Sequence, residues 1–183
     1  LVQVLEALRY LHSQGIVHGE VRPANILHTS NGWRLGGLEY RGPMSRRLEE
    51  FGYSQNHFVF RSPETQDRSA EHSSADIWSL AVVAHAALTG HLPFDEEESR
   101  DRSDLLWRIL NQEPVPDHLG EPFDRLMANC LVVEPRQRWN AEQALHCMQG
   151  KSVADVPLET VFPSGYEPEV SEPEEPILVA SPP

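Results

Sequence analysis

Lysine is nearly missing from this chain, and positive charge as a whole is in short supply. Lys151 is the single lysine among 183 residues, and 15 Lys and Arg residues face 28 Asp and Glu residues, for a net charge of −13. A protein that binds nucleic acid needs a cationic surface to displace counterions from the phosphates. Anionic membrane surfaces also attract basic segments rather than acidic ones. We therefore expect neither nucleic acid nor a membrane surface among the partners of this chain.

Long hydrophobic runs and cysteines are scarce as well. The longest apolar stretch, residues 80–92, is interrupted by polar residues and is too short to span a bilayer, which predicts no membrane insertion. Residues 1–15 lack the basic start and the cleavage site of a signal peptide. Cys130 and Cys147 form no CxxC pair and no zinc-binding spacing, so we expect buried thiols in a reducing compartment. These features predict an intracellular, cytoplasmic protein, and the missing initiator Met predicts a fragment.

The acidic charge is concentrated near the C-terminus. Residues 151–183 hold seven acidic residues, one lysine and seven of the 15 prolines. Proline removes the backbone donors that helices and sheets require, and acids that repel one another keep a chain extended. We predict an acidic, proline-rich, disordered tail over residues 151–183 and a single domain over residues 1–150.

Hydrophobic periodicity predicts mostly helical structure in that domain. Apolar residues at positions 1, 4, 5, 8 and 11 form one stripe of a helix that ends at Gly15. Short strands are expected at 16–17, 26–28 and 33–35, and the Asn-Gly within residues 29–32 favours a hairpin between the last two.

Four further helices are expected after a long irregular segment. Residues 74–88 are apolar on nearly every side, which predicts a helix in the middle of the domain that stops at Gly90. Three more helices are predicted around 102–111, 121–132 and 140–149. Asn140 and Gln143 have the spacing of a capping box at the start of the last one.

Several motifs occur in an order that points to one family. Residues 18–25 read His-Gly-Glu-Val-Arg-Pro-Ala-Asn, which resembles the catalytic loop of eukaryotic protein kinases, His-Arg-Asp-x-Lys-Pro-x-Asn. Residues 62–64, Ser-Pro-Glu, resemble the Ala-Pro-Glu that closes the kinase activation segment. Residues 76–80 and 88–94 resemble the start and the exit of the central helix, and residues 134–139 resemble the Asp-Pro-x-x-Arg-Pro before the last helix.

The resemblance implies a mainly α fold, namely the C-terminal lobe of a protein kinase, a helical bundle with a small β-hairpin. It also implies that the N-terminal lobe is missing from this chain. That lobe supplies a Gly-x-Gly-x-x-Gly loop over the phosphates and a strand lysine. The chain contains no such glycine triplet, and its only lysine lies near the other end.

The scaffold positions of the family are intact in this sequence. By resemblance, Glu64 pairs with Arg138 and ties the activation segment to the helical base, as a buried ion pair that is costly to break. The resemblance also implies that Asp76 accepts hydrogen bonds from the backbone of the catalytic loop. His18 is expected to pack against Asp76.

The positions that carry the chemistry are altered. Glu20 stands at the place of the catalytic Asp, and its extra methylene displaces the carboxylate by about 1 Å, which can cost about a hundredfold in rate. Arg22 replaces the catalytic-loop Lys, whereas Asn25 keeps the residue that the resemblance implies as a metal ligand. Gly37 aligns with the Asp of the Asp-Phe-Gly motif and has no oxygen for Mg²⁺, and Glu39 lies two residues away. We interpret Glu20 and Asn25 either as a catalytic base and a metal ligand, or as structural remnants of a former catalytic site.

Two functions from different classes follow from these substitutions. The first is a catalytically impaired, pseudokinase-like scaffold or regulator that binds an unidentified protein partner and needs no cofactor. The alternative is an atypical Ser/Thr protein kinase that uses ATP and Mg²⁺, with Glu20 as base and with its N-terminal lobe outside this fragment. A third possibility is an incomplete product that does not fold stably, because the apolar surface under the missing lobe would be exposed.

An acidic run precedes one of the predicted helices. Residues 95–98 read Asp-Glu-Glu-Glu, and Asp101 and Asp104 follow shortly after. Such a run is typical of a solvated loop, and acids also suit the start of a helix. A docking site for a basic partner is the other interpretation.

Overall fold

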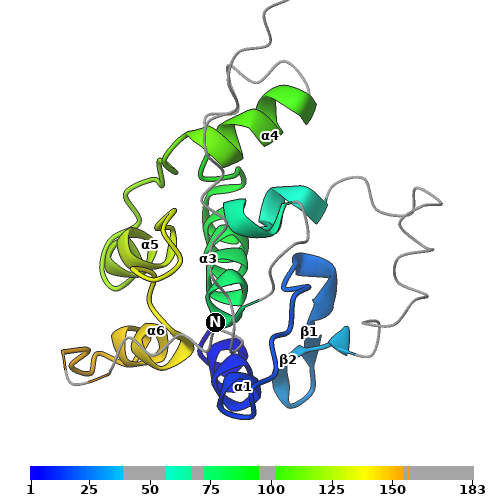
Figure 1. Cartoon of the computed structure of the whole chain (residues 1–183). Helices are drawn as coiled ribbons and strands as arrows, with labels where there is room; N and C mark the ends of the chain where they lie inside the picture. Colours follow the sequence, from blue (N-terminus) through cyan, green and yellow to red (C-terminus); the bar gives the residue numbers. More distant parts are fainter. Residues whose placement is uncertain (39–56, 67–71, 95–101, 155, 157–183) are drawn as a thin grey trace, which may run out of the picture.

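The computed structural model describes residues 1–38, 57–66, 72–94, 102–154 and 156. Helix α3, Ser73–Thr89, runs through the middle of the molecule (Figure 1). Helix α1 and the β-hairpin lie toward one end of α3, α4 lies at the other end, and α5 and α6 lie along one side. The described residues thus form a mainly helical fold with one small sheet, as the sequence predicts.

Helix α3 is central because it is apolar on most of its surface. Every residue from Ser73 to His85 is buried, and Trp78 and Val82 have no exposed surface. A helix that must bury every side can do so only inside a domain. The helix ends at Gly90, where the sequence places its stop.

Helix α1, Val2–Ser13, buries the predicted stripe through Val4, Leu5 and Leu8. Strands β1, Ile26–Thr29, and β2, Gly32–Leu35, form the predicted antiparallel hairpin, in which Ile26 pairs with Leu35. The hairpin is fastened to α1, because the Trp33 N–H donates a hydrogen bond to the Gln3 Oε1 at 2.8 Å.

The strand predicted at residues 16–17 is wrong. The Ile16 N–H donates to the Leu11 carbonyl at 3.0 Å, which completes the end of α1. Two apolar residues directly after a helix can therefore cap the C-terminal end of that helix instead of forming a strand. A pattern of only two residues does not distinguish a helix end from a strand.

The other predicted helices are present with slightly shorter bounds. They are α4, Arg102–Asn111, α5, Phe123–Cys130, and α6, Ala141–Met148. Asn140 and Gln143 form the predicted capping box at the start of α6. Three short 3₁₀ turns complete the described elements: η1, Pro23–Asn25, η3, His57–Phe60, and η4, Pro63–Thr65.

The core brings these helices together around α3. Its fully buried members include Leu8, Trp78, Val82, Ile109 and Ala144. The two cysteines are buried free thiols, as predicted. Burial raises the pKa of the Cys130 thiol and also that of Cys147, which keeps both sulfurs in the unreactive thiol form.

The packed chain continues a few residues past α6. Val153 is buried in the core, and the Gln143 Nε2 donates to the Val156 carbonyl at 3.1 Å. Residues 157–183, the greater part of the predicted tail, lie outside the described residues, so their disorder stays a prediction. Within the described ranges, no helix is long and apolar enough to cross a membrane.

Candidate functional site

Asp76, in the first turn of α3, organises the loop that follows α1. Its carboxylate accepts hydrogen bonds from the backbone N–H groups of His18 and Gly19, each at 2.7 Å, and from the His12 Nε2 at 2.8 Å. Asp76 is 1% exposed, so three donors replace the water that its charge has lost. Gly19 has a φ of +72°, a conformation that favours glycine.

His18 links the loop to the segment that follows the hairpin. Its Nδ1 accepts the Glu20 N–H at 3.2 Å, which leaves the Nε2 to donate to the Gly36 carbonyl at 2.8 Å. These two contacts match the ring tautomer that carries its hydrogen on Nε2. The buried ring therefore holds residues 18–20 in place and joins them to residue 36.

The Glu20 carboxylate lies between two guanidinium groups. Its Oε1 is 2.9 Å from the Arg61 Nη2, and its Oε2 is 3.5 Å from the Arg22 Nε. Glu20 is 27% exposed, which leaves these pairs only partly screened by water. These two pairs tie the carboxylate to the loop and to residue 61.

Asn25 lies directly against Gly37. The Asn25 Nδ2 donates to the Glu20 carbonyl at 2.7 Å, and the Gly36 N–H donates to the Asn25 carbonyl at 2.8 Å. Gly37 has a φ of +86°, and a Cβ added there would lie 2.6 Å from the Asn25 Nδ2. A side chain at position 37 would therefore require Asn25 to move.

This arrangement does not fit a magnesium ion. Mg²⁺ requires oxygen ligands in near-octahedral geometry, usually including carboxylates. Position 37 has neither a carboxylate nor room for one beside the present Asn25 side chain. Elsewhere in the part of the chain that the structure describes, no three His, Cys, Asp or Glu residues are grouped to hold a metal. Glu39 lies outside the described residues.

Glu64 and Arg138 form a two-point ion pair beneath the site. The Arg138 Nη1 donates to the Glu64 Oε1 at 2.7 Å, and the Nη2 donates to the Oε2 at 3.2 Å. Arg138 has no exposed surface, and its guanidinium lies 4.9 Å from the centre of the Trp78 ring. The pair joins η4 to the turn before α6 and to α3.

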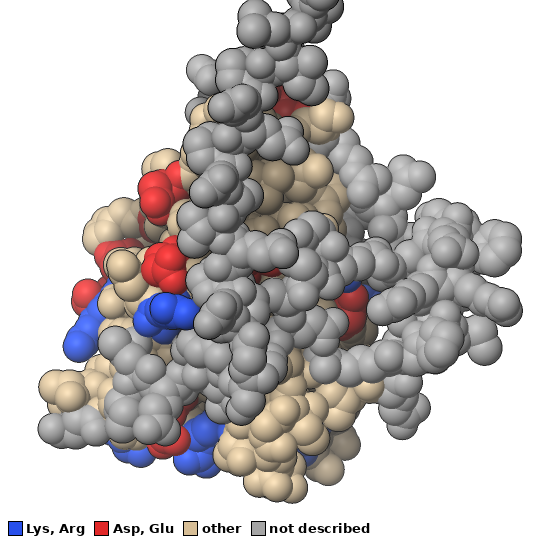
Figure 2. All heavy atoms as spheres, in the orientation of Figure 1, with Lys and Arg blue, Asp and Glu red and all other residues tan. Residues whose placement is uncertain are grey.

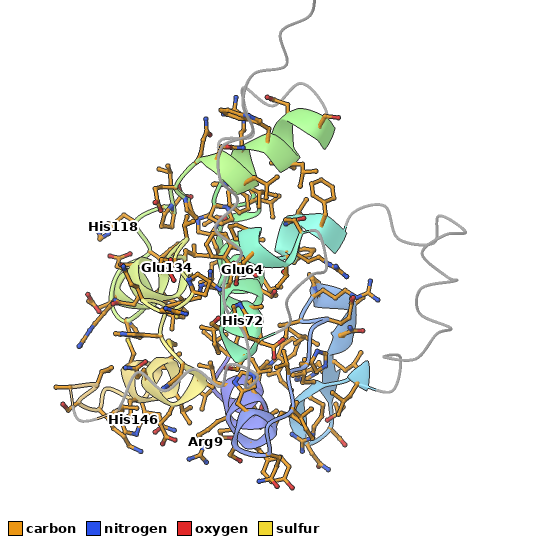
Figure 3. All side chains as sticks on the ribbon, viewed as in Figure 1. Arg9, Glu64, His72, His118, Glu134 and His146 are labelled. Carbon is orange, nitrogen blue, oxygen red and sulfur yellow. The ribbon has the colours of Figure 1, made fainter. Side chains whose placement is uncertain are left out.

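The sequence-predicted residues therefore fall into two groups in space. Glu20, Arg22, Asn25 and Gly37 gather around the loop after α1, where His18 and Asp76 support them. The Glu64–Arg138 pair lies deeper, against α3, and Figure 3 shows Glu64 and His72 near the middle of the molecule.

Residues 1–148 match the protein kinase domain family. The chain belongs to the protein kinase family. It is 31% identical over 151 residues to mitogen-activated protein kinase kinase 7 of Arabidopsis thaliana, covering 78% of this chain and 49% of that protein. It is 28% identical over 163 residues to ribosomal protein S6 kinase alpha-6 of Mus musculus, covering 79% of this chain and 20% of that protein.

A calcium/calmodulin-dependent protein kinase of Metarhizium anisopliae is 27% identical over 165 residues, covering 84% of this chain and 42% of the relative. This kinase chain thus spans less than half the length of each of these three relatives.

The contacts of two residues in this kinase domain could not be predicted from the sequence. Arg61 pairs with Glu20 across a separation of 41 residues, and His12 reaches Asp76 from the last turn of α1. His12 lies in residues 11–18, which resemble the usual approach to the kinase catalytic loop, but its contact with Asp76 could not be read from that likeness, and Arg61 belongs to no such motif. Arg61 directly precedes Ser62, the first residue of the Ser-Pro-Glu motif, and this adjacency is the only signal that could have drawn attention to it.

His72 makes the stability of the kinase domain depend on pH. It is 1% exposed at the start of α3, its Nδ1 lies 2.5 Å from the Ser74 Oγ, and its Nε2 lies 4.0 Å from the Glu64 Oε1. Burial lowers the pKa of His72, although the Glu64 charge opposes this effect. The folded chain therefore keeps the ring neutral at a pH where the unfolded chain binds a proton.

We expect a stabilising contribution from His72 above about pH 6.5, its ordinary pKa, that is lost as the pH falls below that value. His72→Asn should then reduce the difference between the free energies of unfolding at pH 8 and at pH 5, as measured by urea denaturation. The comparison at pH 8, where both side chains are neutral, is the internal control. An unchanged or larger difference in the variant would contradict this assignment.

Proposed function

We propose that this chain is the C-terminal, helical lobe of a protein kinase domain whose phosphate-transfer site is impaired, and that it acts as a pseudokinase by binding proteins. The proposal rests on Gly37. The position that aligns with the metal-binding Asp has no side chain, and the Asn25 amide occupies the space that a side chain there would need. Without that carboxylate, the residues present do not form a Mg²⁺ site.

The surroundings of Glu20 support the same conclusion. A general base must be free to take a proton from the attacking hydroxyl. The Glu20 carboxylate is instead held by Arg61 at 2.9 Å and flanked by Arg22 at 3.5 Å. The carboxylate therefore holds residue 61 on the loop, and a substrate hydroxyl would have to displace Arg61 to reach it.

The preserved scaffold supports a binding role. Asp76 and the Glu64–Arg138 pair make the contacts that the resemblance to kinases implies. Positions 20 and 37, which align with the catalytic Asp and the metal-binding Asp, carry different residues. Leu27 and Trp33, on the hairpin, are 50% and 44% exposed. Large exposed apolar side chains are typical of surfaces that another domain or protein covers.

An atypical Ser/Thr kinase is the second candidate, and one observation favours it. Glu20 is still acidic, it is 27% exposed, and Asn25 lies beside it through the hydrogen bond to its carbonyl. A substrate hydroxyl that displaced Arg61 would meet a carboxylate. In that case ATP and a metal would be needed from a complete domain that includes an N-terminal lobe.

Nucleotide binding and phosphate transfer separate the two candidates. A ligand at 100 times its Kd stabilises the folded state by about 2.7 kcal/mol, which raises the melting temperature by several degrees. We expect no such rise for the full-length protein with millimolar ATP and Mg²⁺ or Mn²⁺, and no phosphate transfer to itself or to a generic protein substrate. Glu20→Ala should behave like the wild type in both assays. Phosphate transfer that Glu20→Ala abolishes would establish the kinase instead.

A further inference from the structure

We draw no further inference here: the strongest candidate, the surface patch that Trp107 and Leu110 form on the outer face of helix α4, carries nothing, because Asp104 is already paired with Arg108 on the same helix and neither the contacts of the described residues nor the face of the molecule drawn in Figure 2 shows what covers this patch.

Discussion

Arg138→Met is expected to lower the free energy of unfolding by about 3–5 kcal/mol, the usual cost of removing one partner from a buried ion pair. This is the largest effect that we expect from any single substitution in the chain. The Glu64 carboxylate, whose side chain is 12% exposed, would lose its two-point partner and remain in a place with little water.

The size of this effect follows from the contacts of the guanidinium. All five N–H groups of Arg138 have acceptors: two go to Glu64, and one each to the carbonyls of Ser74, Val132 and Val133. The variant would leave three backbone carbonyls without these donors, and buried acceptors without partners are costly. Urea denaturation followed by circular dichroism measures the change in the midpoint and in the free energy.

Two further variants test whether charge or packing causes the loss. Arg9→Met removes an ion pair at 3.5 Å whose side chains are 48% and 41% exposed, and it should change stability by less than about 1 kcal/mol. The double variant Glu64→Leu, Arg138→Met removes both charges and should recover part of the loss. If Arg138→Met alone costs no more than Arg9→Met, the buried pair does not have the role assigned to it.

Most of the helical framework could be predicted because it is encoded locally. The apolar surface of residues 74–88 requires burial on all sides, and α3 lies at the centre of the described fold. The Asn140–Gln143 capping box depends on residues three positions apart, so the sequence contains everything that is needed to recognise it. Periodicity and capping are short-range signals, and they are reliable where the elements are long.

The arrangement of the candidate site depends on contacts that no local pattern contains. The absence of a carboxylate at position 37 is visible in the sequence, but the Asn25 amide that fills the space beside it is not. The Arg61–Glu20 pair likewise joins residues 41 positions apart. Such contacts are decided by how the loop and residues 57–66 pack on α3, which is a property of the tertiary structure.

These contacts also explain how an altered site can persist on an intact scaffold. The supports at Asp76 and at Glu64 face the core and stabilise the fold whether or not phosphate is transferred. The Glu20 carboxylate forms ion pairs with Arg22 in the loop and with Arg61, and the second pair holds the loop to residue 61. Folding therefore depends on the supports at Asp76 and Glu64 and not on phosphate transfer.

Asp76→Asn tests the support nearest the candidate site, and we expect it to cost about 3 kcal/mol of stability, since hydrogen bonds to a charged group contribute about 1.5–3 kcal/mol each. The carboxylate accepts from His18, Gly19 and His12 on its two oxygens. An amide keeps the shape but replaces one oxygen with an NH₂ group, which would face an N–H donor. The variant should therefore both lose stability and release the loop.

Hydrogen exchange distinguishes release of the loop from general destabilisation. The amides of His18 and Gly19 should exchange faster in Asp76→Asn by more than the amides in the middle of α3, because their acceptor is the group that changes. Asp104→Asn, at a side chain that is 35% exposed, is the control and should leave both amides protected. Uniform acceleration throughout α3 would mean that Asp76 supports the whole fold rather than the loop, and the link between this carboxylate and the geometry of residues 18–20 would then be lost.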